Sequence, residues 1–403
     1  MTGVRSAVVV GAGVGGLAVA GALARTGWQV TILERADRLR PGRAGLLLWP
    51  NGVAALRALG LGAGLDAIST PVPSSGIRRP DGSWLRQPPR SPDGARPAVV
   101  HREDLQDALV AGLGDLIDIR TGVTVRAARP ATPERPTVSD GRSSWEADLV
   151  IGADGVGGVL RQRLAPASQP VSGGCAAWRS VVPWYRAPEL PAGIPPTGET
   201  LGSGHRFSWA LLGERGSAGG SSRGGISWTA LVPGAARPEP PEVQLSLLRR
   251  WFAGWHLPVT QLLAVTEPDD LVQEDVIELR PLPESFAIAV GTGGYALLGD
   301  AAHALPDHLG MAPSLALEDA ATLQGLLIGT LPGHGLPVAL QEYSRLRRAR
   351  AVALLKQARR LGTALQADGH PLARVRDAAF GVSVPKLMDA LAATAAQWRP
   401  PTR

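Results

Sequence analysis

Three glycines near the N-terminus have a spacing that suits a bound pyrophosphate. Gly11, Gly13 and Gly16 follow an apolar run over residues 7–10 that predicts a buried strand, and they precede a predicted helix over residues 17–23. In such a unit the first glycine allows the turn, the second lets a phosphate approach the backbone, and the third lets helix and strand pack closely. The free N–H groups at the start of the helix attract the phosphates. The sequence therefore predicts a dinucleotide-binding turn.

The carboxylate of Glu34 follows a second predicted strand, over residues 29–33. It lies about twenty residues beyond the glycines, a distance at which an acid accepts hydrogen bonds from ribose hydroxyls. We count the adjacent Arg35 among the cofactor-binding candidates. The alternative is a glycine-rich turn in an ordinary α/β protein, with Glu34 as a solvated strand end.

Two further carboxylates follow buried strands later in the chain. An apolar run over residues 147–151 precedes Asp154, and another over residues 295–298 precedes Asp300. Because open α/β sheets bind ligands at the carboxyl edge of their strands, both acids are predicted to lie at that edge. An acid there can hold a polyol, such as a ribityl chain, by accepting its hydrogen bonds. For Asp154 the alternative is a cap on the helix predicted over residues 156–164.

Taken in order, these three motifs resemble those of the single-component FAD-dependent aromatic hydroxylases, the para-hydroxybenzoate hydroxylase family. Shorter stretches resemble that family as well: Arg43-Ala-Gly45, Leu48-x-Pro50-Asn51, His101-Arg102-x-Asp104-Leu105, Trp178-Arg179 and Ala316-Leu-Glu318-Asp319-Ala320. The resemblance covers nearly the whole chain. It implies an α/β fold in which a Rossmann-like FAD-binding domain carries an inserted mixed β-sheet substrate domain and C-terminal helices.

The resemblance also implies roles for single residues toward FAD. The glycine turn would hold the pyrophosphate, Glu34 the adenosine ribose and Asp300 the ribityl chain. Arg43 and Arg102 would lie beside the pyrophosphate or the incoming NAD(P)H, with solvated surface arginines as the alternative. Asp154 would belong to a motif shared between flavin and nicotinamide binding.

The loop that follows Asp300 departs from the family pattern. By resemblance, Gly310, Met311 and Ala312 would lie against the isoalloxazine ring of the flavin. Ala312 stands where the family has a glycine, and Pro313 lacks a backbone N–H donor. Both changes would crowd or move the flavin, whose oxygen chemistry needs a dry pocket.

The same loop contains our three catalytic candidates, Asp307, His308 and Gly310. Asp307 and His308 would add an acid and a base near the flavin ring, where they would act on the substrate as general acid and general base. The alternative is that both are ordinary polar loop residues.

The function that the resemblance implies is an FAD-dependent monooxygenase. NAD(P)H would be the co-substrate that reduces the flavin, and O2 would supply the oxygen that hydroxylates or epoxidises an aromatic or polyunsaturated small molecule, in secondary metabolism or aromatic catabolism. The altered loop keeps two alternatives open. One is a relative that acts as a non-redox cyclase or isomerase, and the other is a flavin-dependent dehydrogenase without oxygenation.

The substrate would lie between the flavin and a sheet predicted within residues 170–280. Six of the 11 tryptophans fall in that segment. Trp178, Trp209 and Trp228 lie in its short alternating strands and are the substrate-binding candidates, because an indole offers a large apolar face with one donor. Plain core packing is the alternative.

These elements divide the chain into a discontinuous FAD-binding domain, a substrate-binding β-sheet domain and a C-terminal helical region. We predict their bounds as residues 1–75, 98–165 and 281–330 for the first, 76–97 and 166–280 for the second, and 331–403 for the third.

Two local predictions concern the last third of the chain. Strands over residues 286–290 and 295–298 are predicted to be of the parallel type. Past residue 337 an amphipathic helix is predicted, with a solvated basic face made of Arg345, Arg347, Arg348 and Arg350.

Composition and charge exclude several classes of function. The 403 residues are 44% hydrophobic and 19% charged, as in globular domains. The net charge of +6 comes from scattered arginines without a dense basic stripe, so we predict no nucleic-acid partner. No apolar run approaches the ~20 residues of a membrane span. The single Cys175 excludes an internal disulfide and a thiolate cluster, and the dispersed histidines predict that no metal is bound.

The start of the chain and its cysteine content favour the cytoplasm. The glycine turn begins about ten residues from Met1, which leaves no room for a signal peptide. We therefore expect a cytoplasmic enzyme, either a monomer or a homodimer.

Overall fold

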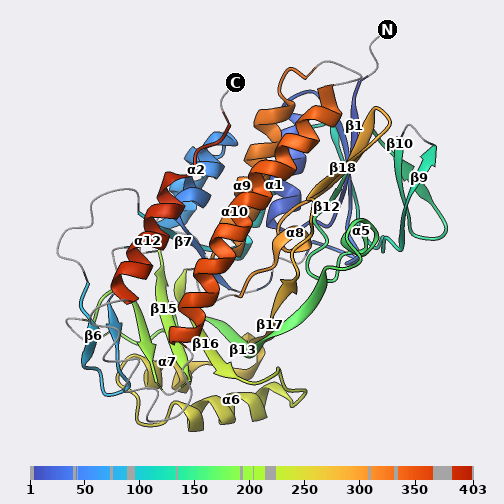
Figure 1. Ribbon diagram of the computed structural model, residues 1–403. Coiled ribbons are helices and arrows are strands. Elements are labelled where there is room, and N and C mark those ends of the chain that lie inside the picture. Colours follow the sequence, from blue (N-terminus) through green and yellow to red (C-terminus); the bar gives the residue numbers. More distant parts are fainter. Residues whose placement is uncertain are drawn as a thin grey trace.

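The structure is a computed structural model. It describes residues 4–39, 42, 44–72, 76–88, 96–132, 135–190, 194–202, 204–213, 224–306, 310–330, 335–365 and 384–401. Within these ranges the chain forms a six-stranded sheet, a seven-stranded sheet and two three-stranded sheets, with helices packed around them (Figure 1). The predicted fold class, a Rossmann-like α/β domain with a mixed substrate sheet and C-terminal helices, is confirmed.

The six-stranded sheet has the order β18-β19-β12-β1-β2-β8. Its strands are β1 (Ser6–Val10), β2 (Gln29–Leu33), β8 (Ile117–Arg120), β12 (Leu149–Gly152), β18 (Ala287–Val290) and β19 (Gly293–Leu297). All neighbours pair in parallel except β18 and β19, which are antiparallel, so the parallel type predicted for residues 286–290 is wrong. Only residues 291–292 join these two strands, and so short a link permits only an antiparallel pair.

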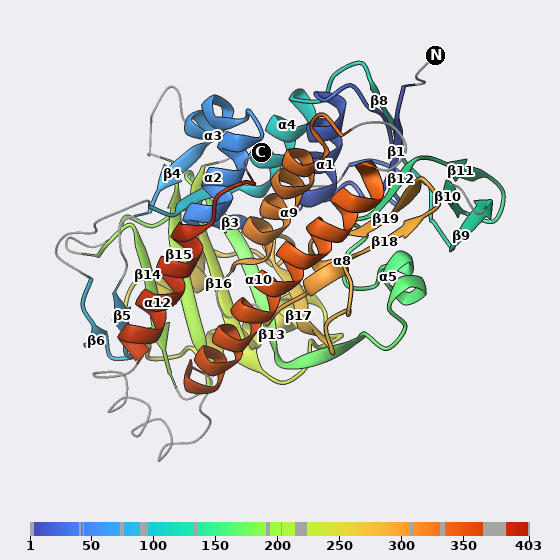
Figure 2. The ribbon, with the colours of Figure 1, turned by 45° about the horizontal axis from the view of Figure 1, so that its top comes forward.

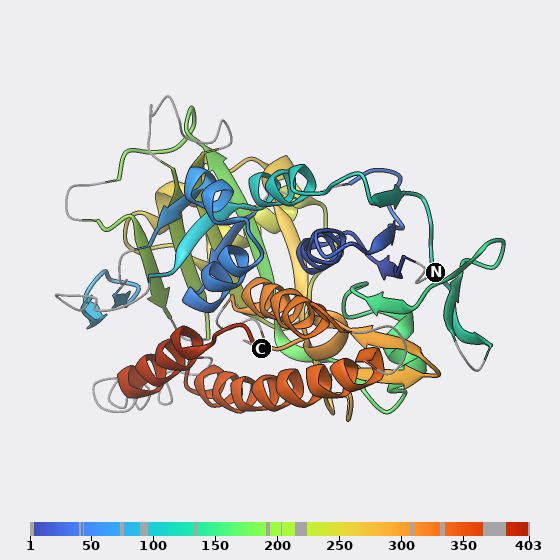
Figure 3. The same ribbon diagram turned by 90° about the horizontal axis from the view of Figure 1, so that it is seen from above.

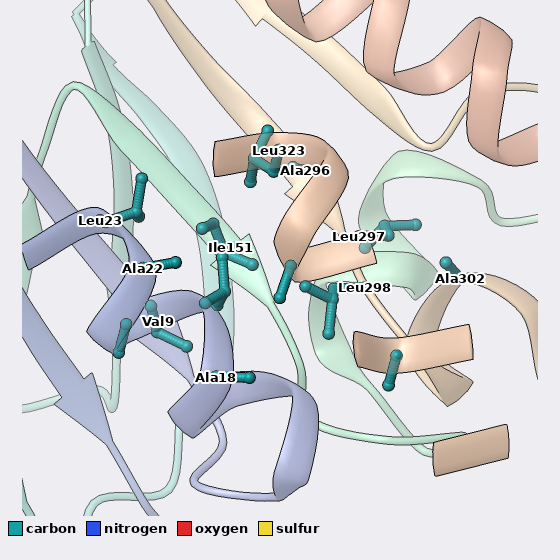
Figure 4. Packing of buried hydrophobic residues seen from close by; sticks show 14 of the residues in the cluster. Val9, Ala18, Ala22, Leu23, Ile151, Ala296, Leu297, Leu298, Ala302 and Leu323 are labelled. Atoms are coloured by element: carbon teal, nitrogen blue, oxygen red, sulfur yellow. The ribbon is translucent and has the colours of Figure 1, made fainter. Parts of the chain in front are cut away.

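Helix α1 (Val14–Ala24) packs on this sheet, and α4 (Arg102–Ala111) and α9 (Ala312–Leu327) pack against α1. Helix α1 consists of small and aliphatic residues and is buried over nearly its whole length, because it contacts α4, the sheet and α9. Figure 4 shows this core, with Val9 and Ile151 from the sheet, Leu23 from α1 and Leu323 from α9. The packing fixes the glycine turn, which lies between β1 and α1.

The seven-stranded sheet has the order β17-β13-β16-β15-β14-β5-β6. Its strands are β5 (Ile77–Arg78), β6 (Trp84–Arg86), β13 (Gln169–Pro183), β14 (Thr197–Leu201), β15 (Arg206–Leu212), β16 (Gly225–Pro233) and β17 (Val272–Arg280). Helices α6 (Pro241–Trp251) and α7 (Val259–Val265) cover one face of this sheet, which we call its outer face (Figure 1). We call the opposite face its inner face, and one of the three-stranded sheets packs on it.

The smaller elements connect these layers. They are β3 (Gly45–Leu48), β4 (Ser69–Pro71), β7 (Ala98–His101), β9 (Ala127–Thr132), β10 (Arg135–Ser139), β11 (Ser144–Glu146), α2 (Pro50–Ala58), α3 (Gly62–Ile68), α5 (Val159–Leu164), the 3-10 helix η1 (Pro268–Asp270) and α8 (Asp300–His303). The sheet β3-β7-β4 packs on the inner face of the seven-stranded sheet, where Leu47 and Val99 meet Val181 and Leu212.

The long helix α10 (Gly335–Leu365) lies against α9 and β18, and α12 (Val384–Gln397) packs beside it and against α2 (Figures 2 and 3). The solvated basic face predicted for this segment is wrong at Arg347, whose side chain is only 2% exposed. Its guanidinium is buried because it pairs with Glu318 and Asp319 of α9.

The strands predicted for the substrate part of the chain all lie in the seven-stranded sheet. The exact division into domains stays a prediction. None of the helices in the described ranges is long and apolar enough to cross a membrane.

Candidate active site

The three glycines of the first turn differ in what a side chain at each position would contact. Gly11 has a φ of +103°, and a Cβ there would lie 2.4 Å from the carbonyl oxygen of Ala153. A Cβ on Gly16 would lie 2.0 Å from the carbonyl oxygen of Gly11. At Gly13, by contrast, a Cβ would meet nothing within 4 Å. Gly11 and Gly16 are therefore required by the protein's own packing, whereas Gly13 leaves open space at the N-terminus of α1.

That open space belongs to a cavity of about 780 Å³ that reaches both large sheets. The residues around it include Gly13–Gly16, Gly45–Leu47, Arg102, Ala153 with Gly155, Gly299–Asp300, Gly310 with Ala312–Pro313, and part of the seven-stranded sheet. The cavity extends from the N-terminus of α1, past the carboxylate of Asp300, to the inner face of the seven-stranded sheet. This shape suits an extended dinucleotide with a substrate beyond its far end.

Glu34 fastens the glycine turn to the end of β2. Its Oε2 accepts a hydrogen bond from the backbone N–H of Ala12 at 2.8 Å, and its Oε1 accepts one from Ala36 at 2.9 Å. An ionised carboxylate has about four acceptor positions, so capacity remains for ribose hydroxyls. Arg35 beside it is exposed and lies outside the described cavity lining. The predicted ribose contact of Glu34 stays a prediction.

Asp154 lies just behind the cavity wall that Ala153 and Gly155 form. Its Oδ2 accepts a hydrogen bond from the backbone N–H of Val159 at 2.8 Å, as the helix-capping alternative requires. Its Oδ1 is buried without a hydrogen-bond partner. A Cβ on Gly158 would lie 2.3 Å from this Oδ1, which explains the glycine there.

Burial raises the pKa of the Asp154 carboxyl above its ordinary value, despite the hydrogen bond from Val159. A raised pKa in the folded state means that folding favours the protonated form, so Asp154 costs stability once pH rises through that pKa. Asp154→Asn is neutral at every pH, so it is expected to have a higher Tm than the wild type at neutral pH. Thermal unfolding of both proteins at neutral pH and below pH ~4 checks this, because the difference vanishes where the wild-type carboxyl is protonated. A lower Tm of the variant at neutral pH contradicts it.

The second carboxylate, Asp300, does border the cavity. It is the first residue of α8 and is exposed. The preceding Gly299 has a φ of +60°, and its backbone N–H donates to Asp319 Oδ2 at 2.8 Å. Arg102, the first residue of α4, also borders the cavity.

In the loop after α8 residues 304–306 are described and the description resumes at Gly310, so Asp307 and His308, like Arg43, lie outside the described residues. Gly310 has a φ of +56°. Gly310, Ala312 and Pro313 border the cavity, whereas Met311 packs in a core cluster. Pro313 lies in the first turn of α9, where a backbone N–H has no intrahelical partner, so its missing donor costs the helix nothing.

The three tryptophans predicted to bind substrate point their indoles to the outer face of the seven-stranded sheet. Trp178 Nε1 donates to Gln244 of α6 at 3.0 Å, and Trp228 Nε1 donates to Thr266, after α7, at 3.0 Å. Trp209 is paired across the strands with Trp228 and therefore shares its face. Trp209 and Trp228 are among the residues that border the cavity, but both also belong to the core cluster under α6 and α7. Core packing, the alternative interpretation, fits these contacts.

The inner face of the same strands is polar and faces the cavity. Its residues there are Thr197, Glu199, Arg206, Ser208, Ser227 and Thr229. Ser227 Oγ accepts a hydrogen bond from the backbone N–H of Gly45 in β3, which places this face toward the glycine-turn side. Arg206 Nε lies 2.7 Å from Glu199 Oε1. The Thr197 hydroxyl is buried and has no hydrogen-bond partner.

The sequence carried a signal for this polar face. In residues 206–210 charged or small residues alternate with Phe207 and Trp209, the pattern of a strand with two unlike faces. The prediction places the substrate on the aromatic face, which the amphipathic α6 covers in the structure.

The sequence predictions give no role to a second group of residues, an ion-pair cluster between α9 and α10. Asp319 Oδ1 accepts a hydrogen bond from Arg347 Nε at 2.5 Å, and Glu318 pairs with both Arg347 and Arg350. Burial alone raises the pKa of the Asp319 carboxyl, but nearby His303 and Arg347 outweigh it and hold the pKa below its ordinary value. The sequence does indicate this cluster, because Glu318 and Asp319 are adjacent acids in an otherwise mostly apolar helix, and buried carboxylates require cationic partners.

Comparisons with known proteins agree with this geometry. A family model described as an FAD binding domain matches residues 5–195. The chain is 31% identical to the aurachin C monooxygenase/isomerase of Stigmatella aurantiaca, covering 88% of each chain. It is 32% identical to the 3-amino-4-hydroxybenzoate 2-monooxygenase of Streptomyces cremeus, covering 92% of this chain and 90% of that protein. A solved variant of Klebsiella pneumoniae HpxO complexed with FAD has a TM-score of 0.80 at 26% identity, covering 97% of this chain and 99% of that one.

Proposed function

Because this chain belongs to the family of FAD-dependent aromatic hydroxylases and is a flavoprotein monooxygenase, we propose that it uses NAD(P)H and O2 to hydroxylate an aromatic small molecule that carries polar ring substituents. The observation that carries this proposal is the single cavity that borders both the glycine turn and the polar inner face. A relative that acts on a hydroxylated benzoate supports an aromatic ring as the substrate. We also propose the cytoplasm, where NAD(P)H is supplied, as its compartment.

The residues present fit FAD. When bound, FAD supplies the redox chemistry, taking two electrons from NAD(P)H and delivering them to O2, so that one oxygen atom enters the substrate and the other leaves as water. The open space at Gly13 and the N-terminus of α1 would receive the pyrophosphate. Asp300 would accept hydrogen bonds from the ribityl hydroxyls, and Gly310 with Ala312 would border the ring.

The inner face of the seven-stranded sheet would hold the substrate. Thr197 and Ser208 offer hydroxyls, and the Glu199–Arg206 pair offers a carboxylate and a guanidinium at the same wall. Such groups orient a ring through its oxygen and nitrogen substituents. Walls that exclude water around the bound substrate would let the enzyme direct oxygen to it. Asp307 and His308 stay our candidates for general acid and base.

A visible absorption spectrum and an oxygen-uptake assay of the purified protein test this function. We expect the bands of oxidised flavin and NAD(P)H-dependent O2 consumption that aromatic substrates increase. A colourless protein without O2 uptake would instead favour a non-redox cyclase or isomerase. Formation of the same product without O2 would favour a dehydrogenase.

Thr197→Val is expected to weaken substrate binding without destabilising the protein. Valine has nearly the shape of threonine, and the hydroxyl that it removes has no partner within the protein. A lost neutral hydrogen bond of about 0.5–1.5 kcal/mol corresponds to a rise in KM of about 2- to 10-fold, with kcat nearly unchanged. Steady-state kinetics with the preferred aromatic substrate measures this.

Thr200→Val is the matched control, because Thr200 lies on the same strand but on the outer face. Its Oγ1 is 2.8 Å from His256 Nε2, so the control loses a hydrogen bond inside the protein. We expect a lower Tm and an unchanged KM for this variant. Equal KM values for Thr197→Val and Thr200→Val would contradict the proposal that Thr197 contacts the substrate.

A further inference from the structure

The adjacent carboxylates of Glu318 and Asp319 on α9 form hydrogen bonds to different segments of the chain. Both Glu318 and Asp319 are fully buried. Asp319 Oδ2 accepts hydrogen bonds from the backbone N–H of Gly299 at 2.8 Å and lies 2.7 Å from His303 Nε2. Glu318 Oε1 instead accepts a hydrogen bond from Asn51 Nδ2 of α2 at 2.6 Å. Asp319 is thus the one that contacts residues 299–303, which we call the Gly299 turn.

Within the Gly299 turn, the backbone N–H groups of Ala302 and His303 both donate to the same carbonyl oxygen of Gly299. Helix α8 is only four residues long, and its N-cap residue provides no side-chain cap. A single helical turn is unstable in isolation, because fixing its backbone costs more than one hydrogen bond returns. The orientation of Asp300, the first residue of α8, therefore depends on contacts from elsewhere in the fold. The contacts of Asp319 to Gly299 and His303 bracket Asp300 on both sides.

We infer that Asp319 is a positioning residue for FAD, which clamps the Gly299 turn so that Asp300 presents its carboxylate to the cavity. Arg347 of α10 supplies the countercharge that keeps Asp319 ionised in the core. The inference rests on the ribityl-binding role proposed above for Asp300.

Helix α10 supports the same turn at a second point. The Tyr343 hydroxyl donates to the backbone carbonyl of Leu297, the last residue of β19, at 2.9 Å. Tyr343 and Arg347 lie one helical turn apart and so reach the strand and the clamp from one face of α10. Helix α10 therefore supports the cofactor site, although none of its described residues borders the cavity.

Asp319→Asn and Glu318→Gln form a matched pair to test this. Each replaces one buried carboxylate beside Arg347 with the amide of the same shape, so both are expected to lower the Tm of the apoprotein. Only Asp319→Asn changes the clamp on the Gly299 turn. We expect the Kd for FAD, measured by quenching of FAD fluorescence on titration with apoprotein, to rise at least 10-fold for Asp319→Asn and less than 2-fold for Glu318→Gln. Equal Kd values for the two folded variants would overturn the inference.

A double variant shows whether Asp319 acts through Asp300. If it does, Asp300→Ala combined with Asp319→Asn binds FAD no more weakly than Asp300→Ala alone, because the clamp has lost the group that it positions. Additive losses would overturn the inference. Wild-type apoprotein that fails to bind FAD would refute the proposed function itself, which is a separate result.

His303→Phe serves if Asp319→Asn does not fold. This variant removes one of the two contacts of the clamp, and it keeps a ring against Phe286, whose centroid lies 5.6 Å from that of His303. Asp319 stays ionised and paired with Arg347 in this variant. We expect a Kd for FAD that is about 3- to 10-fold higher, as for one lost hydrogen bond. An unchanged Kd in a folded His303→Phe protein would overturn the inference.

Discussion

Gly13→Asp is expected to abolish FAD binding and to leave the apoprotein folded and at least as stable as the wild type. Gly13 is the N-cap residue of α1 with φ −72° and ψ −179°, a conformation that aspartate adopts readily at this position. The new carboxylate would accept hydrogen bonds from the first N–H groups of the helix, which favours the folded state. A Cβ there meets nothing in the protein within 4 Å, so the variant changes only the space predicted for the pyrophosphate.

The same carboxylate would repel the phosphates and occupy the amides that bind them. Each lost hydrogen bond to a charged group is worth about 1.5–3 kcal/mol, so two of them lower the affinity by more than about 100-fold. Titration of FAD with the apoprotein gives the affinity, and thermal unfolding of the apoprotein gives the stability. Normal flavin content in Gly13→Asp would refute the predicted position of the pyrophosphate.

Gly16→Ala is the contrasting variant in the same turn. Its Cβ would lie 2.0 Å from the carbonyl oxygen of Gly11, so the helix must move away from the turn. We expect this variant to lose stability by about 1–3 kcal/mol, as overpacked cores do. Loss of FAD in Gly16→Ala therefore reflects a damaged fold, whereas loss of FAD in Gly13→Asp reflects the ligand.

Asp300→Ala is expected to release FAD from a protein that stays folded. Asp300 is exposed at the start of α8, so its removal leaves no cavity in the core. Its contribution to the helix terminus is about 0.3–1 kcal/mol. A hydrogen bond between a ribityl hydroxyl and the carboxylate is worth about 1.5–3 kcal/mol, so the Kd for FAD should rise about 10- to 150-fold for each bond that is lost.

The flavin content of the purified variant and its Kd for added FAD measure this effect. Asp300→Asn keeps one acceptor oxygen and should fall between wild type and Asp300→Ala. A flavin content of Asp300→Ala equal to that of the wild type would remove Asp300 from the ribityl site.

Local sequence was sufficient where a short segment determines its own structure. The glycine spacing at residues 11–16 predicted the first strand, turn and helix, because close backbone contacts leave no room for a side chain at Gly11 and Gly16. Motifs in three parts of the chain predicted the family and its cofactor, which the comparisons confirm. The position of Asp300 at the cavity also follows from its place after a parallel strand.

Long-range packing decided the rest. A strand shows two alternating faces in its sequence, but only the docking of α6 determines that Trp209 is covered and that Thr197 and Arg206 face the cavity. The arginines of α10 have the spacing of a solvated face, yet Arg347 is buried because α9 presents two carboxylates to it.

The sequence by itself therefore determined the glycine turn, the family and the flavin cofactor. The tertiary structure decided which face of the seven-stranded sheet borders the cavity and how the carboxylate after β19 is held. The physical reason is that turn geometry depends on neighbouring residues, whereas the burial of a face or of a charge depends on partners more than twenty positions away in the chain, such as Arg347 for Asp319.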